Sequence, residues 1–190
     1  MFLLWGALTA IRGRSLFAHF DRMELLWVVY NAALCILFLI RSKPSVVSTD
    51  PIHWAIALGT AFSGLLFERH RVHLGLAYGI TAHSFILVGI ACGAAALLML
   101  GRSYDLFPAV RRVKTRWFYG WVRHPIYIFA MVVRLGYVLL NLSPFNVSFF
   151  LVIVWLYDRR AAFEESILAS DERYAAYARR VPYRFVPGVY

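Results

Sequence analysis

The sequence has little charge for its length, and the charge it has is mostly positive. Only 16% of the 190 residues are charged and 61% are hydrophobic, which is too apolar for an ordinary soluble domain. Lys and Arg number 20 against 10 Asp and Glu. In a membrane protein such an excess reflects the positive-inside rule and contact with anionic headgroups, so we expect membrane lipids and no nucleic acid as partners.

Several chemical signatures are missing as well. The two cysteines, Cys35 and Cys92, lie in apolar runs without CxxC or Cys/His spacing and predict neither a disulfide nor a zinc site. His70 and His73 form an HxxH pair, but the sequence lacks the further His-rich clusters of a metal-dependent membrane oxygenase, so no metal site is predicted. Without a Gly-rich strand-to-helix turn, any nucleotide cofactor must bind through membrane helices and loops.

What the sequence does have is long apolar runs, which are continuous rather than alternating and therefore favour helices over a barrel. We expect an all-α integral membrane protein with about five transmembrane helices, near residues 23–40, 52–67, 81–100, 125–141 and 145–158. The last two are short and joined by 142–144, which indicates a helical hairpin. The whole chain, 1–190, is predicted to be one domain. In it, 1–22 is an interfacial segment or N-terminal extension, while 101–124 and 158–190 face the cytoplasm, the latter as a C-terminal cap.

The distribution of basic residues predicts the orientation. Fourteen of the 20 Lys and Arg lie after the first and third expected helices and in the C-terminal tail, against five on the other side, so the larger set should face the cytoplasm. The twentieth, Arg134, falls inside the fourth expected helix. An unpaired guanidinium is costly there, so Arg134 should face the bundle, water or a partner.

Polar residues concentrate in two stretches on the predicted cytoplasmic side, 111–127 and 158–190. In the first, Pro125 fits the first turn of a helix, which places His124 near the positive end of the helix dipole and Tyr127 on the same face. A basic loop that only contacts headgroups would explain the same residues. In the second, Arg160 and Glu164 are four residues apart on one helical face, which fits either a surface ion pair or a carboxylate that binds a cofactor.

The segment Arg123-His124-Pro125-Ile126-Tyr127 resembles the RHPxY signature of the isoprenylcysteine carboxyl methyltransferases and the related phospholipid N-methyltransferases. The residues that follow resemble the family's C-terminal pattern in order and approximate spacing. They are Arg160, Glu164, Glu165, Tyr174, Tyr177, Arg180-Val181-Pro182-Tyr183-Arg184 and Pro187-Gly188. The resemblance covers roughly residues 40 to 190.

This resemblance implies a multi-helix membrane methyltransferase that binds S-adenosylmethionine in a cytoplasm-facing pocket and takes a lipophilic or lipidated acceptor from the bilayer. It places the following residues at the cofactor: Val113, Lys114, Tyr119, His124, Pro125, Tyr127, Glu164 and Glu165. Arg160 matches the arginine near the substrate carboxylate, and we group Arg123 with it as catalytic. A carboxylate acceptor needs no base, whereas an amine would need His124 or Glu165 to take a proton.

Alternatives stay open at this stage. A membrane reductase resembling the sterol and steroid reductases would bind NADPH instead, and a non-enzymatic lipid-binding or transport module would bind neither cofactor. Even for a methyltransferase, the sequence leaves open whether oxygen, nitrogen or sulfur is methylated and which of Glu164 and Glu165 contacts the cofactor. We expect an inner or plasma membrane location with the site facing the cytoplasm, and a monomer is sufficient.

Overall fold

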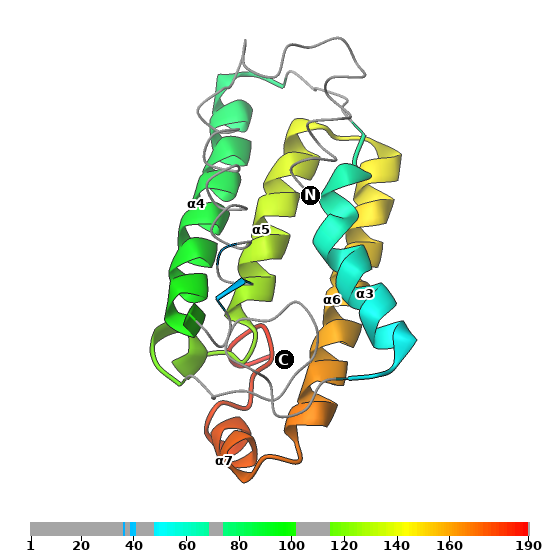
Figure 1. The fold of residues 1–190 in the computed structure, drawn as a ribbon. Helices are drawn as coiled ribbons and strands as arrows, with labels where there is room; N and C mark the ends of the chain where they lie inside the picture. The colour runs from blue at the N-terminus through cyan, green and yellow to red at the C-terminus, as the bar shows by residue number, and fades with distance from the viewer. Residues whose placement is uncertain (1–35, 37–38, 41–47, 69–73, 102–114, 190) are drawn as a thin grey trace.

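The structure, a computed structural model, describes residues 36, 39–40, 48–68, 74–101 and 115–189. Within these residues the chain is all-helical. The α-helices are α3 (Pro51–Phe62), α4 (Leu76–Leu100), α5 (Pro125–Leu140), α6 (Pro144–Leu168) and α7 (Glu172–Arg180). Two 3₁₀ turns, η1 (Ser63–Leu65) and η3 (Trp117–Gly120), follow α3 and precede α5. Figure 1 shows α3 to α6 as a bundle with α7 across one end.

Local sequence sets where the helices begin. Proline occupies the first turn of α3, α5 and α6, where its missing N–H costs no hydrogen bond. The Asp50 side chain caps α3 and the Ser143 side chain caps α6, each by accepting a backbone N–H. Asp171 caps α7 in the same way. These starts are encoded within a few residues and need no tertiary contact.

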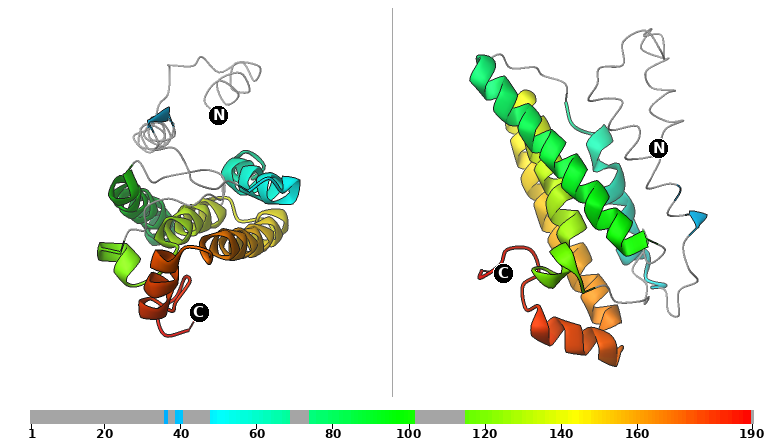
Figure 2. Two further views of the ribbon diagram at one scale, coloured as in Figure 1. Left: turned by 60° about the horizontal axis from the view of Figure 1, so that its bottom comes forward. Right: turned by 90° about the vertical axis from the view of Figure 1, so that its left-hand side faces the viewer.

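The backbones of α4 and α5 approach each other closely at two glycines, Gly89 and Gly136. A Cβ on Gly136 would lie 2.7 Å from the Ala82 carbonyl oxygen, and one on Gly89 would lie 2.6 Å from a Val133 methyl. Small residues of this kind let helix backbones approach closely in membranes. Helix α6 packs against both α3 and α5, and the two views of Figure 2 show these helices side by side.

The observed helices differ from the expected ones at three ends. The expected helix 145–158 continues ten residues further, to Leu168, because Asp158 and the arginines after it end the apolar run without breaking the helix. Helix α4 begins at Leu76, five residues earlier than expected. Helix α3 stops at Phe62 and tightens into η1. A three-residue connection, 141–143, joins α5 to α6.

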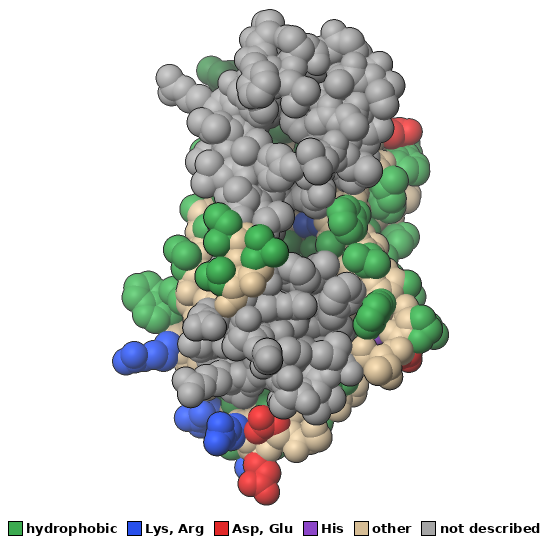
Figure 3. Space-filling model, in the orientation of Figure 1, with side chains coloured by type: hydrophobic (Ala, Val, Ile, Leu, Met, Phe, Trp, Pro, Cys, Tyr) green, Lys and Arg blue, Asp and Glu red, His purple; other side chains and the backbone are tan. Residues whose placement is uncertain are grey.

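Helix α4 has 25 residues and is long and apolar enough to cross a membrane, while α5 is apolar but shorter. Large apolar side chains such as Leu98, Leu151 and Trp155 are exposed on the bundle. Green side chains dominate the described middle of the face in Figure 3, and charged ones gather toward the end that carries α7. The number of membrane spans stays a prediction, because the first expected helix lies mostly outside the described residues, as does the segment 1–22.

Candidate functional site

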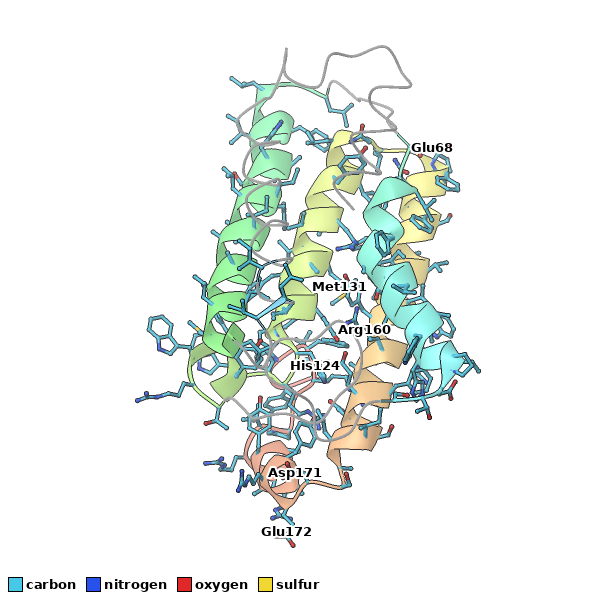
Figure 4. The ribbon with its side chains drawn as sticks, viewed as in Figure 1. Glu68, His124, Met131, Arg160, Asp171 and Glu172 are labelled. Atoms are coloured by element: carbon cyan, nitrogen blue, oxygen red, sulfur yellow. The ribbon has the colours of Figure 1, made fainter. Side chains whose placement is uncertain are left out.

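The candidate site lies where α5 and α6 meet the C-terminal segment. His124 is the residue that precedes α5, and Arg160 lies in the part of α6 that extends beyond the expected helix. Figure 4 shows both side chains in the lower part of the bundle, above α7. His124 and Tyr127 are brought together by the first turn of α5, and their rings stack with centroids 5.3 Å apart and planes 13° apart.

Glu165 is the centre of the charged cluster. Its Oε1 accepts a hydrogen bond from His124 Nε2 at 2.9 Å and lies 3.3 Å from Arg123 Nε, while its Oε2 accepts from Arg184 at 2.8 and 3.2 Å. Burial by itself raises the pKa of Glu165, but the hydrogen bonds from His124 and Arg184 and the charge of Arg123 lower that pKa from 4.5 to about 2. Glu165 is therefore an anion at neutral pH. Because an ionised carboxylate can only accept, His124 Nε2 carries the hydrogen of the bond between these two side chains.

Glu164 binds a second set of partners. Its Oε1 accepts hydrogen bonds from the Tyr127 hydroxyl and, at 3.2 Å, from Arg160 Nε, and its Oε2 lies 3.9 Å from His124 Nδ1. The Arg160 side chain is only 6% exposed. The pair four residues apart on α6 is therefore not a surface ion pair, because α3 and α5 cover it, and removing either partner would leave a charge in a poorly solvated place.

Arg160 also ties α6 to α3. Its NH1 donates to the Thr60 hydroxyl at 2.9 Å and to the Ala57 carbonyl at 3.3 Å. The guanidinium carbon lies 5.0 Å from the centroid of the Tyr127 ring, within the range of a cation–π contact. Arg160 is thus fixed in position by three helices before any ligand binds.

The C-terminal segment 182–185, here called the C-terminal strap, closes this end of the bundle. The backbone N–H groups of Arg123 and His124 donate to the carbonyls of Tyr183 and Arg184 at 3.0 and 3.1 Å. Arg184 NH1 also reaches Asp158 at 2.9 Å. The strap therefore fixes the residues just before α5 and supplies a cation to Glu165 at the same time.

Helix α7 supports the same loop from below. The Tyr177 hydroxyl donates to the Tyr119 carbonyl at 2.8 Å, and Tyr174 and Tyr177 form a buried cluster with Val181. Burial raises the pKa of both tyrosines above its usual value of 10, so both stay neutral at physiological pH. Two buried atoms of the described part lack a hydrogen-bond partner, namely Arg123 Nε and the Tyr174 hydroxyl.

Comparisons with known proteins agree with the sequence signature. Residues 81–170 match the model of the isoprenylcysteine carboxyl methyltransferase (ICMT) family. This part of the chain therefore resembles the ICMT family. A search of curated proteins gave no significant match.

A solved structure shares the fold. It is the eukaryotic intramembrane Ras methyltransferase ICMT, solved without a monobody, which aligns with a TM-score of 0.57 at 16% identity. The alignment covers 87% of this chain and 64% of the eukaryotic chain. The two chains therefore share a fold, although this chain spans less than two thirds of the length of that relative. The expected resemblance is confirmed.

The structure brings most of the predicted site residues together. The charged cluster contains Arg123, His124, Tyr127, Arg160, Glu164 and Glu165, and Pro125 is buried in the first turn of α5. Tyr119 is buried in η3, with its hydroxyl 3.5 Å from the Ala96 carbonyl oxygen. Val113 and Lys114 lie outside the described residues.

Sequence reasoning missed two parts of the cluster. Thr60 has no polar neighbour in the sequence that would mark it, and it joins Arg160 only because α3 packs on α6. Arg184 was part of the C-terminal resemblance but had no assigned role, and it lies 19 residues from Glu165 in the chain. An arginine in a tail that already contains Arg179 and Arg180 carries no local signal of such a contact.

Proposed function

We propose that this protein transfers a methyl group from S-adenosylmethionine to a carboxylate of a lipophilic acceptor that enters from the bilayer, with its site facing the cytoplasm of an inner or plasma membrane. The observation that supports this most is the cluster in which the signature residues His124 and Tyr127 bind the two adjacent carboxylates, Glu164 and Glu165, beside the buried Arg160.

The residues present fit the cofactor chemically. The carboxylates of Glu164 and Glu165 suit its hydroxyl and amino groups, and the stacked rings of His124 and Tyr127 offer a flat apolar face. The buried Tyr174 hydroxyl, which makes no hydrogen bond within the described part of the chain, suits a polar group such as a carboxylate. When bound, S-adenosylmethionine supplies a methyl group already activated by the sulfonium, so no base or nucleophilic side chain is required for an ionised acceptor.

The protein's own contribution is then positioning and exclusion of water. Arg160 is held by Glu164, Thr60 and Ala57, so its guanidinium can orient an acceptor carboxylate without first being ordered, which lowers the entropic cost of reaction. For an amine acceptor a base would be needed. His124 Nε2 is occupied by Glu165, which leaves Nδ1 as the ring nitrogen able to take a proton.

Cofactor binding to the protein purified in mild detergent tests this proposal. We expect micromolar binding of S-adenosylmethionine by calorimetry and none of NADPH. Glu164→Gln and His124→Ala should weaken binding by roughly tenfold or more, since a hydrogen bond to a charged group contributes about 1.5 to 3 kcal/mol. Glu172→Gln is the matched control, because Glu172 is exposed on α7 and should leave binding unchanged.

The opposite result is equally informative. Binding of NADPH without binding of S-adenosylmethionine would replace the proposal by the reductase, and binding of neither would support a lipid-binding module. If the cofactor binds, transfer of a labelled methyl group to prenylcysteine, fatty acid or phosphatidylethanolamine acceptors identifies the class of atom that is methylated.

A further inference from the structure

Two large aromatic side chains project from the loop before α5. Trp117, the first residue of η3, and Trp121, the residue after it, are 73% and 69% exposed. Between them in the sequence, Phe118 packs inward, with its ring centroid 5.0 Å from that of Phe129 on α5. Exposed apolar groups that gather in this way mark a site of contact with a membrane or another protein.

Backbone strain accompanies the exposure of Trp117. Among the described residues other than glycine, only Trp117 has a positive φ, of 56°, a conformation that bulky L-residues rarely adopt. The turn after it is closed, because the N–H groups of Trp121 and Val122 both donate to the Phe118 carbonyl at 3.2 Å. Strained residues of this kind cluster at binding segments, which favours a role for the exposed ring beyond local packing.

The exposed tryptophans lie at one end of the helix that is long enough to cross a membrane. The Tyr119 hydroxyl is 3.5 Å from the carbonyl oxygen of Ala96, near the end of α4, and Figure 1 shows the loop that carries η3 beside that end. Tryptophan is enriched where membrane helices reach the headgroups, because its ring is apolar while its N–H binds polar groups. With α4 spanning the bilayer, Trp117 and Trp121 lie at headgroup depth.

Three exposed arginines flank the two tryptophans. Arg116 directly precedes η3. Arg173 and Arg180 lie four residues before and three after Tyr177 on α7, so they share its side of the helix. That side faces η3, because the Tyr177 hydroxyl donates to the Tyr119 carbonyl at 2.8 Å. Figure 3 shows Lys and Arg side chains gathered at this edge of the molecule, below an exposed apolar one.

The opposite side of α7 carries a different set of charges. Glu172 and Arg179, both exposed, lie five residues before and two after Tyr177, and helical spacing turns them away from η3. Figure 4 shows Glu172 pointing away from the bundle. The side of α7 that faces η3 is therefore basic, while the carboxylate of Glu172 is directed elsewhere.

We propose that these exposed side chains form a binding surface for anionic phospholipids, here called the anchor surface. It consists of Arg116, Trp117, Trp121, Arg173 and Arg180. The indole rings insert at headgroup depth, and the arginines pair with lipid phosphates and with the net negative charge of the leaflet. A bilayer fits this surface better than an acidic protein, because the rings lie at the end of a spanning helix and arginine side chains extend along a membrane surface readily.

Quenching of tryptophan fluorescence by brominated lipids tests the anchor surface. The full chain is reconstituted in phosphatidylcholine bilayers with increasing fractions of brominated phosphatidylglycerol or, in parallel, brominated phosphatidylcholine. The difference between the wild type and Trp117→Phe/Trp121→Phe isolates the two rings. We expect these rings to associate about threefold or more better with phosphatidylglycerol at low salt, and the preference should fall toward one at about 1 M salt, where charges are screened.

Three double variants separate the anchor surface from general basicity. Arg116→Gln/Arg180→Gln should remove the preference for phosphatidylglycerol, while brominated phosphatidylcholine still quenches. Arg159→Gln/Arg179→Gln is the matched control, because it removes two exposed arginines outside the anchor surface, and the preference should remain. Arg116→Lys/Arg180→Lys keeps the charge and should keep the preference, which preserves the test if the glutamine variant fails to fold.

Several outcomes would overturn the proposal. They are equal association of the two lipids with the wild type, a preference that persists in Arg116→Gln/Arg180→Gln, and an equal loss of preference in the matched control. Quenching that is the same with and without Trp117 and Trp121 would place these rings outside the bilayer and overturn it as well. The arginine variants are compared by total quenching, so they decide the question even if the tryptophan variant does not fold.

The anchor surface goes beyond the proposed methyl transfer and does not depend on it. No cofactor is present in the quenching experiment. A failure of lipid selectivity therefore leaves the methyl-transfer proposal standing, and a failure to bind S-adenosylmethionine leaves the lipid result standing.

Discussion

The strongest quantitative prediction concerns Glu165→Gln, which removes the centre of the charged cluster. The Glu165 carboxylate has four close contacts from His124, Arg123 and Arg184, and its side chain is only 13% exposed. A fall in pKa from 4.5 to about 2 corresponds to about 3 kcal/mol of folding free energy at 1.36 kcal/mol per pKa unit. We therefore expect Glu165→Gln to lower the unfolding free energy by about 3 kcal/mol at pH 7.

The pH dependence follows from the sign of this shift. Because the pKa is lower in the folded state, the stabilisation is complete above about pH 4.5 and is lost as the pH falls toward 2, with more than half gone near pH 3. The wild type and Glu165→Gln should therefore differ fully at pH 7, and the difference should shrink steadily as the pH falls from about 4.5 toward 2.

Thermal unfolding in detergent, followed by intrinsic fluorescence, measures this difference. At roughly 2 to 4 °C per kcal/mol for a chain of this size, the gap in Tm at pH 7 should be about 6 to 12 °C. Glu172→Gln, on the exposed face of α7, should follow the wild type at every pH. Parallel curves for the wild type and Glu165→Gln down to pH 3 would show that the contacts of Glu165 do not stabilise the fold.

Two further substitutions test the packing of the bundle. Gly136→Ala should lower the unfolding free energy by about 1 to 3 kcal/mol, because its Cβ would lie 2.7 Å from the Ala82 carbonyl oxygen. Gly79 has open space around it, so the control Gly79→Ala should be neutral or slightly stabilising. Equal Tm values for the two variants would contradict this prediction. Asn146→Ala should cost about 2 to 3 kcal/mol, because the fully buried amide binds both backbone groups of Glu68, and an unchanged Tm would refute it.

Much of the local structure could be predicted from the sequence. Pro125 correctly marked the start of α5 and placed His124 just before it, and spacing correctly put Arg160 and Glu164 on one face of α6. Arg134 was expected to face the bundle, water or a partner, and it is buried in the bundle. The end of α6 was wrong, because hydropathy reports where a helix leaves an apolar environment rather than where its hydrogen bonds stop.

Contacts between distant segments could not be predicted in the same way. The pairing of Arg184 with Glu165 depends on the C-terminal strap returning to the loop before α5, across about 60 residues of chain. Likewise, Thr60 meets both Arg134 and Arg160 only through the packing of α3 against its neighbours.

The sequence by itself thus determined the membrane-protein class, the starts of α3, α5 and α6 and the residue types of the site, because hydropathy, capping and helical spacing act over a few residues. The tertiary structure alone decided which arginine neutralises which carboxylate. A side chain's charge partner is set by how helices cross in space. Glu165 is thereby surrounded by cations, whereas among the described residues Arg134 contacts two carbonyls, a hydroxyl and an aromatic ring.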